Sequence, residues 1–294
     1  MVKYIRVTKK CNQACIYCSA AFDPEPSDAY ILKAISSGED VIITGGEPTL
    51  RKDIIELVKI AKNSGAKKIE LQTNGTTLYY KRLAKGLVDA GVTLFNIAFP
   101  SHRKNICELI TQRKGLHEKR IDGIRNVLKF GGTVRLTMII NRLNKDYIEE
   151  YAEFVGENFP EVFLVEMNFV KLEGRAKNRK WLAVSFDEVE TSLRNSYRIL
   201  KSFGIMLLID GMPICRMKDF ELCNVDLVKY RKKDAHYFWK DLKQKEQGNA
   251  CKNCSLKEIC GGVWKGYLEL FGDAQLIPIT EPLENFIEKI HSKS

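Results

Sequence analysis

Three cysteines near the N-terminus carry the strongest chemical signal in the sequence. Cys11, Cys15 and Cys18 are spaced C-x3-C-x2-C and follow a short run of alternating apolar residues, 4–8. One short loop with this spacing can place three thiolates around one corner of an iron–sulfur cube. A [4Fe–4S] cluster needs four ligands, so three from the loop would leave one iron open to a substrate or a cofactor. Three buried cysteines without metal, or a zinc site that lacks its fourth ligand, are the alternatives.

A glycine-rich turn after the second predicted strand is the next candidate. Gly45, Gly46, Glu47 and Pro48 follow the apolar, β-branched run 40–44. Two adjacent glycines let the backbone approach a ligand closely and adopt dihedral angles that are closed to other residues. A carboxylate at this place can accept a hydrogen bond from an ammonium group. Taken alone, the turn could equally be a simple connection in an α/β fold.

Together the two motifs resemble the signature of the radical S-adenosylmethionine (SAM) enzymes. Tyr17 is the bulky residue that this family has directly before the third cysteine. The resemblance implies that the three cysteines hold a [4Fe–4S] cluster whose open iron binds SAM, and that the turn with Glu47 holds the SAM amino group. It also implies that an electron from the cluster cleaves SAM to a 5′-deoxyadenosyl radical. The electron donor would be a partner such as ferredoxin or flavodoxin.

Two more residues lie where related enzymes often place polar SAM contacts. Asn74 follows the predicted strand 68–72, although an Asn-Gly turn is also a common way to leave a strand. Many relatives carry a serine on the fourth strand, where this chain has Ala98. The expectation therefore moves to Ser101, just past that strand. The neighbouring His102 is either an acid–base group or an exposed loop histidine.

Arg135 and Thr137 alternate with apolar neighbours on the predicted fifth strand and so share one face. A cation inside a barrel is costly unless it is paired. The SAM carboxylate is one suitable partner for Arg135, and a barrel glutamate such as Glu166 is the other. The sequence leaves both open.

A second group of cysteines lies near the C-terminus. Cys251, Cys254 and Cys260 have the spacing C-x2-C-x5-C. This segment resembles the core of the SPASM and twitch extensions of radical SAM enzymes, which hold auxiliary [4Fe–4S] clusters. The full SPASM pattern has a further cysteine where this chain has Trp264. One auxiliary cluster is therefore expected, and a zinc site is the alternative.

A fourth ligand for that site must come from elsewhere in the chain. Cys215 follows an apolar, strand-like run and the stiff Pro213, so its backbone should be well fixed, and we expect it to be the ligand. Cys223 lies in a more charged stretch and is the alternative, or else a surface thiol. Cys107 is expected to be a core residue.

The elements between these motifs indicate an α/β fold. Six strands, each followed by a helical stretch, imply parallel strands joined by right-handed crossovers, and the polar candidates lie past the strand ends. We therefore expect a partial (β/α)6 TIM-like barrel over residues 1–208 and a small C-terminal cysteine-rich iron–sulfur module over 209–294. The predicted strands are 4–8, 40–44, 68–72, 92–99, 133–140 and 162–170. The helices are expected near 28–37, 51–63, 76–90, 105–111, 119–130, 145–158 and 186–203, the last capped by Ser185.

Composition supports an intracellular metalloprotein. Nine cysteines at metal-ligand spacings indicate a reducing cytoplasm, and a disulfide framework fits poorly. The sequence has no apolar span of membrane length and begins directly with a predicted strand, which argues against a targeting peptide. The net charge of +10 could indicate a nucleic-acid partner, but basic residues scattered among glutamates favour an ordinary solvated surface.

The sequence thus predicts a cytoplasmic radical SAM enzyme of the SPASM/twitch branch that modifies a peptide or protein. The alternatives are a small-molecule enzyme of cofactor biosynthesis and an RNA-modifying factor. We expect no membrane partner.

Overall fold

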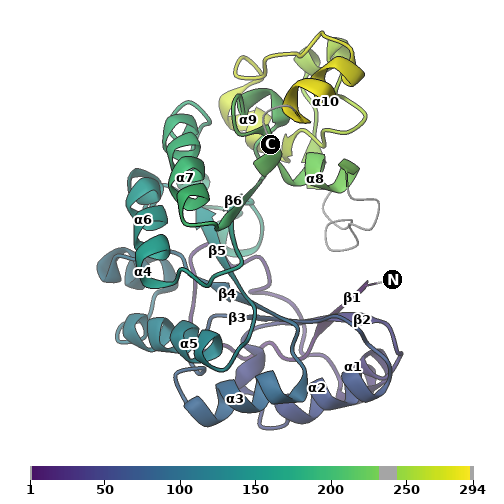
Figure 1. Cartoon of the computed structure of the whole chain (residues 1–294), viewed down its shortest axis with the longest axis vertical. Coiled ribbons are helices and arrows are strands. Elements are labelled where there is room, and N and C mark those ends of the chain that lie inside the picture. The colour runs from purple at the N-terminus through teal and green to yellow at the C-terminus, as the bar shows by residue number, and fades with distance from the viewer. Residues whose placement is uncertain (1, 232–243, 292–294) are drawn as a thin grey trace.

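The computed structural model describes residues 2–231 and 244–291. Its centre is a seven-stranded parallel sheet in which each strand pairs with its neighbour in sequence (Figure 1). Within the described residues β1 and β7 form the two edges, so the sheet is an open barrel. The strands are β1 Val2–Arg6, β2 Asp40–Thr44, β3 Ile69–Thr73, β4 Leu94–Ala98, β5 Val134–Ile140, β6 Leu164–Phe169 and β7 Met206–Asp210.

Helices connect the strands and cover the outer face of the sheet (Figure 1). They are α1 Asp28–Ile35, α2 Ile54–Asn63, α3 Lys81–Ala90, α4 Lys104–Thr111, α5 His117–Lys129, α6 Ile148–Asn158 and α7 Glu190–Ser202. Ser27 caps α1 through its side chain, as such residues do when they accept from a free N–H of the first turn. The predicted partial TIM-like barrel is confirmed.

The two faces of the sheet differ in chemistry. Alternate residues such as Leu71, Phe95 and Met167 pack against the helices in the main hydrophobic core. The opposite, inner face carries a polar row that the strand register makes continuous: Glu70, Gln72, Asn96, Arg135, Thr137, Glu166, Asn168 and Asp210. A sheet covered on both faces would be apolar on both. The polar row therefore indicates a face that meets a polar ligand.

Two details differ from the sequence prediction. The apolar run before the C-terminal module forms a seventh strand, β7, which pairs with β6, whereas six were expected. The boundary proposed between residues 208 and 209 therefore falls inside a strand. The last barrel helix begins at Glu190 instead of 186, because Ser185 donates through its N–H and hydroxyl to Glu188 and forms a turn. Ser185 does not cap this helix.

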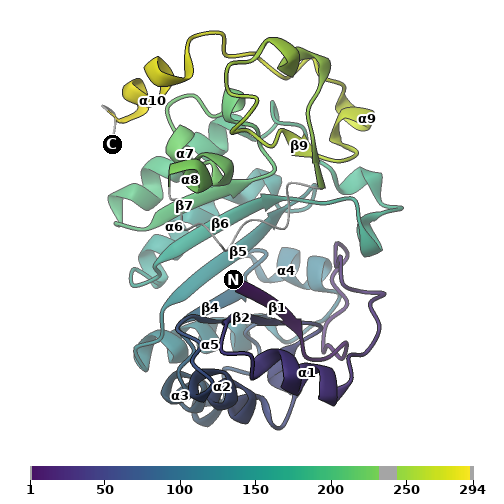
Figure 2. The same ribbon diagram turned by 90° about the vertical axis from the view of Figure 1, so that its right-hand side faces the viewer.

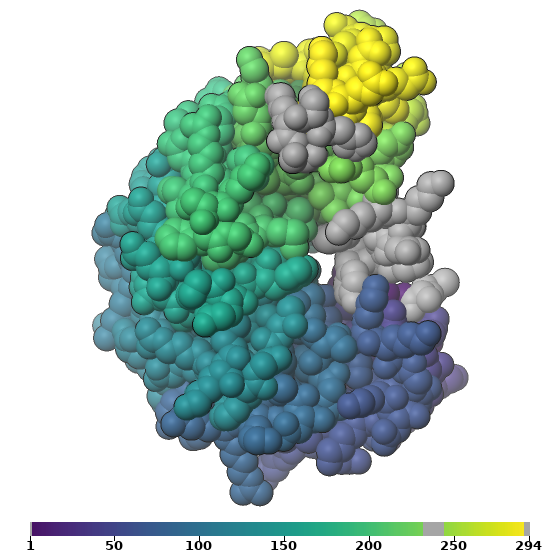
Figure 3. Space-filling model, viewed as in Figure 1, coloured from purple at the N-terminus to yellow at the C-terminus, as the bar shows by residue number. Residues whose placement is uncertain are grey.

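The remaining described residues form a small module beside β7 (Figure 2), and the space-filling view shows this part as the green and yellow end of the molecule (Figure 3). Its elements are short: α8 Val225–Arg231, β8 Lys245–Glu246, β9 Val263–Trp264, α9 Tyr267–Phe271 and α10 Leu283–His291. Part of it shares the main core, and a separate cluster of five buried apolar residues lies around Ile214 and Phe286. In the described parts of the chain, no helix has the length and apolar character needed to cross a membrane.

Candidate functional site

The N-terminal cysteines lie on a loop that follows β1 and is held by its neighbours. The N–H groups of Ala14 and Ile16 donate to the carbonyls of Thr111 and Ile110 at 3.0 and 2.9 Å. These carbonyls end α4 and have no partner within that helix. Tyr17 is half-buried and packs with Ile16 against a small apolar cluster. The loop is therefore anchored between its cysteines.

The segment after β6 packs against this loop. Gly174 has φ +54°, and a Cβ at this position would lie 2.3 Å from the Cys18 carbonyl oxygen. The N–H of Arg175 donates to that oxygen at 3.0 Å, and the Arg179 guanidinium donates to the Ile16 carbonyl at 2.8 Å. The close approach requires glycine, and it gives the cysteine loop a second support.

The glycine-rich turn packs directly on the start of the cysteine loop. Gly46 and Glu47 donate through their N–H groups to the carbonyls of Thr8 and Lys10 at 2.7 and 2.8 Å. A Cβ at Gly46 would lie 2.3 Å from the Lys10 oxygen, so no larger residue fits without displacing the loop. The two motifs that the sequence singled out are therefore one structural unit.

The Glu47 carboxylate is fully buried where the glycine-rich turn and the cysteine loop meet. Its Oε1 accepts from the N–H of Thr49 at 3.1 Å and from the hydroxyl of Thr73 at 2.6 Å, and the Thr49 hydroxyl also donates to it. Its Oε2 accepts from the N–H of Asn74 at 2.6 Å. Burial raises the pKa of the Glu47 carboxyl, and these hydrogen bonds oppose that rise. Both oxygens are thus engaged by the protein itself.

Asn74 connects the end of β3 with the cysteine loop. Its amide donates to Asn12 Oδ1 at 2.8 Å and lies 4.0 Å from the sulfur of Cys11. Its Oδ1 accepts from the N–H and the hydroxyl of Thr76 at 3.0 and 2.7 Å. The loop, the turn after β2 and the turn after β3 therefore meet at one edge of the sheet.

The three thiols fit a shared metal group. All three are free; burial raises the pKa of Cys11 and Cys15, and the field of Cys18 adds to the rise for both, as does that of Cys11 for Cys15. Burial is the main cause, and it raises the pKa of Cys15 to about 12. Metal binding supplies the positive charge that such thiolates need. Among the described residues no three His, Cys, Asp or Glu side chains converge on a single metal ion, whereas each thiolate of a cube binds a different iron.

The family model of the radical SAM superfamily matches residues 5–155, which run from the end of β1 through β5 and include the whole cysteine loop. The chain belongs to the radical SAM superfamily. Membership implies an enzyme with a [4Fe–4S] cluster and SAM, as the sequence predicted.

Curated relatives of this radical SAM chain include GTP 3′,8-cyclases. The probable GTP 3′,8-cyclase of Pyrococcus horikoshii is 34% identical over 173 residues, which cover 55% of this chain and 54% of the relative. The GTP 3′,8-cyclase of Helicobacter pylori is 34% identical over 182 residues, 56% of each chain. The match thus spans about half the length of these relatives.

Solved structures show the same fold at low sequence identity. SuiB of Streptococcus suis bound to S-adenosylmethionine has a TM-score of 0.61 at 15% identity and covers 89% of this chain and 72% of its own. The anSMEcpe structure with bound AdoMet has a TM-score of 0.56 at 17% identity, with 71% and 64% covered. These likenesses show the fold, and the SPASM/twitch assignment stays a prediction.

Other residues predicted to contact SAM have partners within the protein. Ser101 is buried, and its hydroxyl accepts from the N–H of Arg103 at 3.1 Å. Arg135 lies on the inner face between Glu70, to which it donates, and Glu166, whose carboxylate is 3.3 Å away. Glu166 was one of the two partners expected for Arg135. Contacts of Ser101 and Arg135 with SAM stay predictions.

His102 is neither exposed nor placed against the cysteine loop. Its side chain is 12% exposed, packs on Phe154 and lies 3.5 Å from the Glu150 carboxylate. Burial lowers the pKa of His102, and Glu150 opposes that effect. The expectation of an exposed loop histidine was wrong, because the loop folds back onto α6.

The C-terminal cysteines also gather. The fields of Cys251 and Cys254 act on Cys215, and that of Cys215 acts on Cys260. Burial is the main cause that raises the pKa of Cys215 to about 11 and of Cys260 to about 12. Four neighbouring free thiols form a donor set that suits an iron–sulfur cluster, in which each thiolate binds a different iron. The structure thus places Cys215 with the C-x2-C-x5-C segment.

Cys223, the alternative fourth ligand, lies elsewhere. It is 2% exposed and packs in the main core, where the field of Glu221 acts on it and those of the clustered cysteines do not. The suggestion of a surface thiol was wrong, because the charged stretch around it turns its apolar side inward. Cys107 is 1% exposed, as expected of a core residue.

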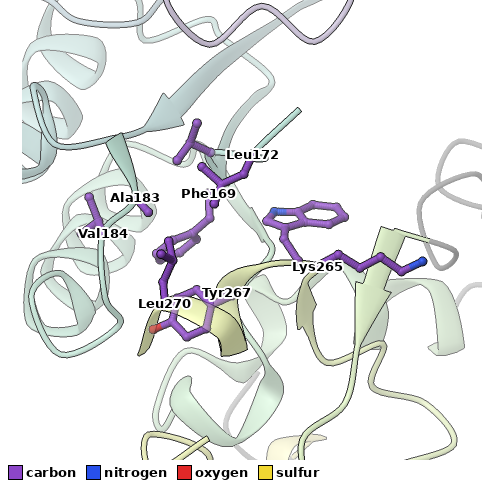
Figure 4. Close-up of a pocket in the computed structure, with 9 residues that line it drawn as sticks. Phe169, Leu172, Ala183, Val184, Lys265, Tyr267 and Leu270 are labelled. Carbon is purple, nitrogen blue, oxygen red and sulfur yellow. The ribbon is translucent and has the colours of Figure 1, made fainter. Parts of the chain in front are cut away.

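Trp264, which stands where the full SPASM pattern has a cysteine, lies at the seam between the module and the barrel. Figure 4 shows Phe169 and Tyr267 at the same seam. The Trp264 indole nitrogen would lie 2.0 Å from a Cβ at Gly211, so the ring packs flush on the backbone after β7. The cavity that it lines with Phe169 and Tyr267 measures about 10 Å³. That volume is about one water, so the seam is a packing interface.

Sequence reasoning missed two buried cations, because neither lies in a motif. Lys245 is 2.7 Å from Asp210 at the end of β7 and 2.9 Å from Asp226 of the module. This ion pair network joins the two parts of the chain. The second cation, Arg120 of α5, lies beneath the cysteine loop. A single basic residue such as Arg120 or Lys245 has no sequence pattern around it that would predict its burial.

Proposed function

We propose that this protein reductively cleaves SAM at a [4Fe–4S] cluster held by Cys11, Cys15 and Cys18 and uses the radical on a small polar molecule. The observation that carries the proposal is the meeting of the cysteine loop, the glycine turn and Asn74 at one edge of the sheet. When bound, the cluster supplies the electron for the cleavage. The protein's own residues bind, orient and shield the reacting groups.

Glu47 acts in this proposal as a positioning residue. Its carboxylate already accepts four hydrogen bonds from Thr49, Thr73 and Asn74. It therefore has little capacity left for the SAM ammonium group that the sequence assigned to it. It fixes the backbone of the turn, and that backbone would then meet SAM. Tyr17, Gly45, Gly46, Asn74, Ser101 and Arg135 remain the proposed SAM-binding residues.

We further assign a second [4Fe–4S] cluster to Cys215, Cys251, Cys254 and Cys260, with zinc as the alternative. The support is the mutual electrostatic influence of these thiols and the small core around them. Because reduced iron–sulfur clusters and free thiols need reducing surroundings, the proposal includes a cytoplasmic location and a ferredoxin or flavodoxin as electron donor.

A small-molecule substrate is favoured over a peptide. The curated relatives named above are GTP 3′,8-cyclases, whereas the solved structures that hold a peptide, anSMEcpe with a Cp18Cys peptide and SuiB with its precursor peptide, share the fold alone at 18% and 14% identity. The inner face of the sheet offers a row of hydrogen-bonding groups from Gln72 to Asn168, which suits a polar molecule of small size. GTP is the first substrate to test, in a reaction of the cofactor-biosynthesis class.

The test uses anaerobically reconstituted protein with SAM and a strong reductant. We expect 5′-deoxyadenosine from the wild type and none from the triple Ala variant of the three N-terminal cysteines. With GTP present, 5′-deoxyadenosine should increase and GTP should be consumed in step with it. Consumption of SAM without any loss of GTP would remove GTP as the substrate and leave the cleavage intact. Cleavage by the triple variant would refute the assignment of the cluster.

A further inference from the structure

A buried guanidinium lies beneath the cysteine loop. Arg120 is 1% exposed and extends from α5 toward the loop. Its Nε donates to the Asn74 carbonyl at 2.9 Å, its Nη1 to the sulfur of Cys107 at 2.8 Å and its Nη2 to Gln13 Oε1 at 3.2 Å. Gln13 stands between the first two cysteines, and its Oε1 is 3.6 Å from the Cys15 sulfur. One side chain thus joins three separate segments.

Within the residues that the structure describes, Arg120 has no carboxylate partner within 4.0 Å, and its side-chain hydrogen bonds all go to uncharged groups. Its three acceptors are a carbonyl, an amide oxygen and a thiol, and burial raises the pKa of that thiol, Cys107, so that it stays neutral. Burying an unpaired charge is strongly destabilising, so such a cation is expected to have an anionic partner in the working enzyme.

The cysteine thiolates are the anions nearest at hand. Gln13 Oε1 lies between the two groups, 3.2 Å from Arg120 Nη2 and 3.6 Å from the Cys15 sulfur. Three thiolates on an oxidised [4Fe–4S] cluster leave the assembly with a net negative charge, and reduction adds one more. A nearby buried cation stabilises the more negative form more strongly, because the interaction grows with the charge and is little screened by solvent.

We propose that Arg120 is the counter-charge of the SAM-binding cluster: it holds the loop through Gln13 and raises the reduction potential of the cluster. This inference rests on the proposed function. Arg120 reaches the cysteine loop through Gln13 and donates to none of the three loop thiols, so we class it as a positioning residue. It eases the transfer of an electron from the external donor.

The experiment compares Arg120→Gln and Arg120→Lys with Arg125→Gln as the matched control. Arg125 lies on the same helix with a side chain that is 54% exposed. Each protein is reconstituted anaerobically, its iron is counted, and the cluster is titrated by EPR without SAM or substrate. At the wild-type midpoint potential, the ratio of reduced to oxidised cluster should fall at least tenfold in Arg120→Gln, a shift of 59 mV for one electron. Arg120→Lys should stay within threefold of the wild type, and the control should match it.

Every result of this experiment either supports or overturns the proposed role of Arg120. A fully loaded Arg120→Gln protein with an unchanged potential would overturn it. Equal shifts in the Gln and Lys variants would also overturn it, because the hydrogen-bond geometry and not the charge would then matter. If Arg120→Gln loads no cluster, loading of Arg120→Lys supports the charge role, and failure of both refutes it. A wild-type protein without a cluster would instead refute the proposed function.

Discussion

The two cysteine groups of this protein are supported in different ways. The N-terminal loop is bonded to distant segments: α4, the turns after β2 and β3, and the segment around Gly174. The C-terminal group is bonded within itself and to other parts of the same small module, as when Cys254 donates through its N–H to the Cys251 carbonyl and Ser255 to that of Ile279. The apolar cluster around the C-terminal group has five buried residues. The core beneath the sheet is far larger.

The difference shows what a metal group would contribute at each place. A loop braced by a sheet keeps its shape without metal, so the metal there serves chemistry. A small irregular module needs a further cross-link, since a small core rarely supplies more than about 3–5 kcal/mol. Metal at the second site would therefore contribute to folding.

Removal of iron should produce the largest difference between the C-terminal module and the barrel. When an anaerobic sample is treated with a chelator, the C-terminal module should lose its protection against hydrogen exchange, because its cross-link is gone. Peptides from β5 should keep theirs. The measurement is hydrogen exchange read by mass spectrometry. Equal loss in both regions would show that the module and the barrel depend on metal alike.

Changing Cys11, Cys15 and Cys18 together to Ala should abolish SAM cleavage and remove about half of roughly eight irons, the content of two [4Fe–4S] clusters. The melting temperature should change little, because backbone bonds hold this loop. Iron analysis, a 5′-deoxyadenosine assay and calorimetry test the three parts. A collapse of the fold would show that the loop is not self-supporting.

Within the C-terminal module, Cys215→Ala and Cys223→Ala form a matched pair. Cys215→Ala should lose the second cluster and destabilise the module, because it removes a thiol of the group. Cys223→Ala should keep all iron and lose about 1–2 kcal/mol of unfolding free energy, as a small core truncation does. Mössbauer spectroscopy and iron analysis distinguish them. The opposite pattern would transfer the ligand role to Cys223, and retained iron in both would argue against four cysteine ligands.

Glu47→Ala tests the bracing of the first site. It leaves the donors on Thr49, Thr73 and Asn74 without their acceptor, which costs about 1–3 kcal/mol for an unsatisfied buried group. We expect both clusters to be kept while the unfolding free energy falls by about 1–3 kcal/mol and the SAM binding free energy weakens by about 1.5–3 kcal/mol. Chemical denaturation and calorimetry measure these changes. If stability is unchanged and SAM binding is weaker, the original interpretation, in which Glu47 contacts SAM directly, would be supported instead.

Much of the fold could be read from the sequence because local patterns determine it. The strand 40–44 was predicted to the residue, and the boundaries of most other elements within a few positions, since apolar runs, glycine turns and caps are local signals. The family was recognised for the same reason. Cys11, Cys15 and Cys18 lie within eight residues, and their spacing alone limits the ligands that they can hold.

Contacts between distant segments were decided by the tertiary structure. The pairing of β7 with the sheet, the closure of Gly174 over the cysteine loop and the saturation of Glu47 all depend on backbone approaches that no local pattern encodes. The same is true of Arg120 and Lys245, whose charges are ordinary in sequence and unusual in their burial. Their roles arise from the low polarity of their surroundings, which exists only once the chain has folded.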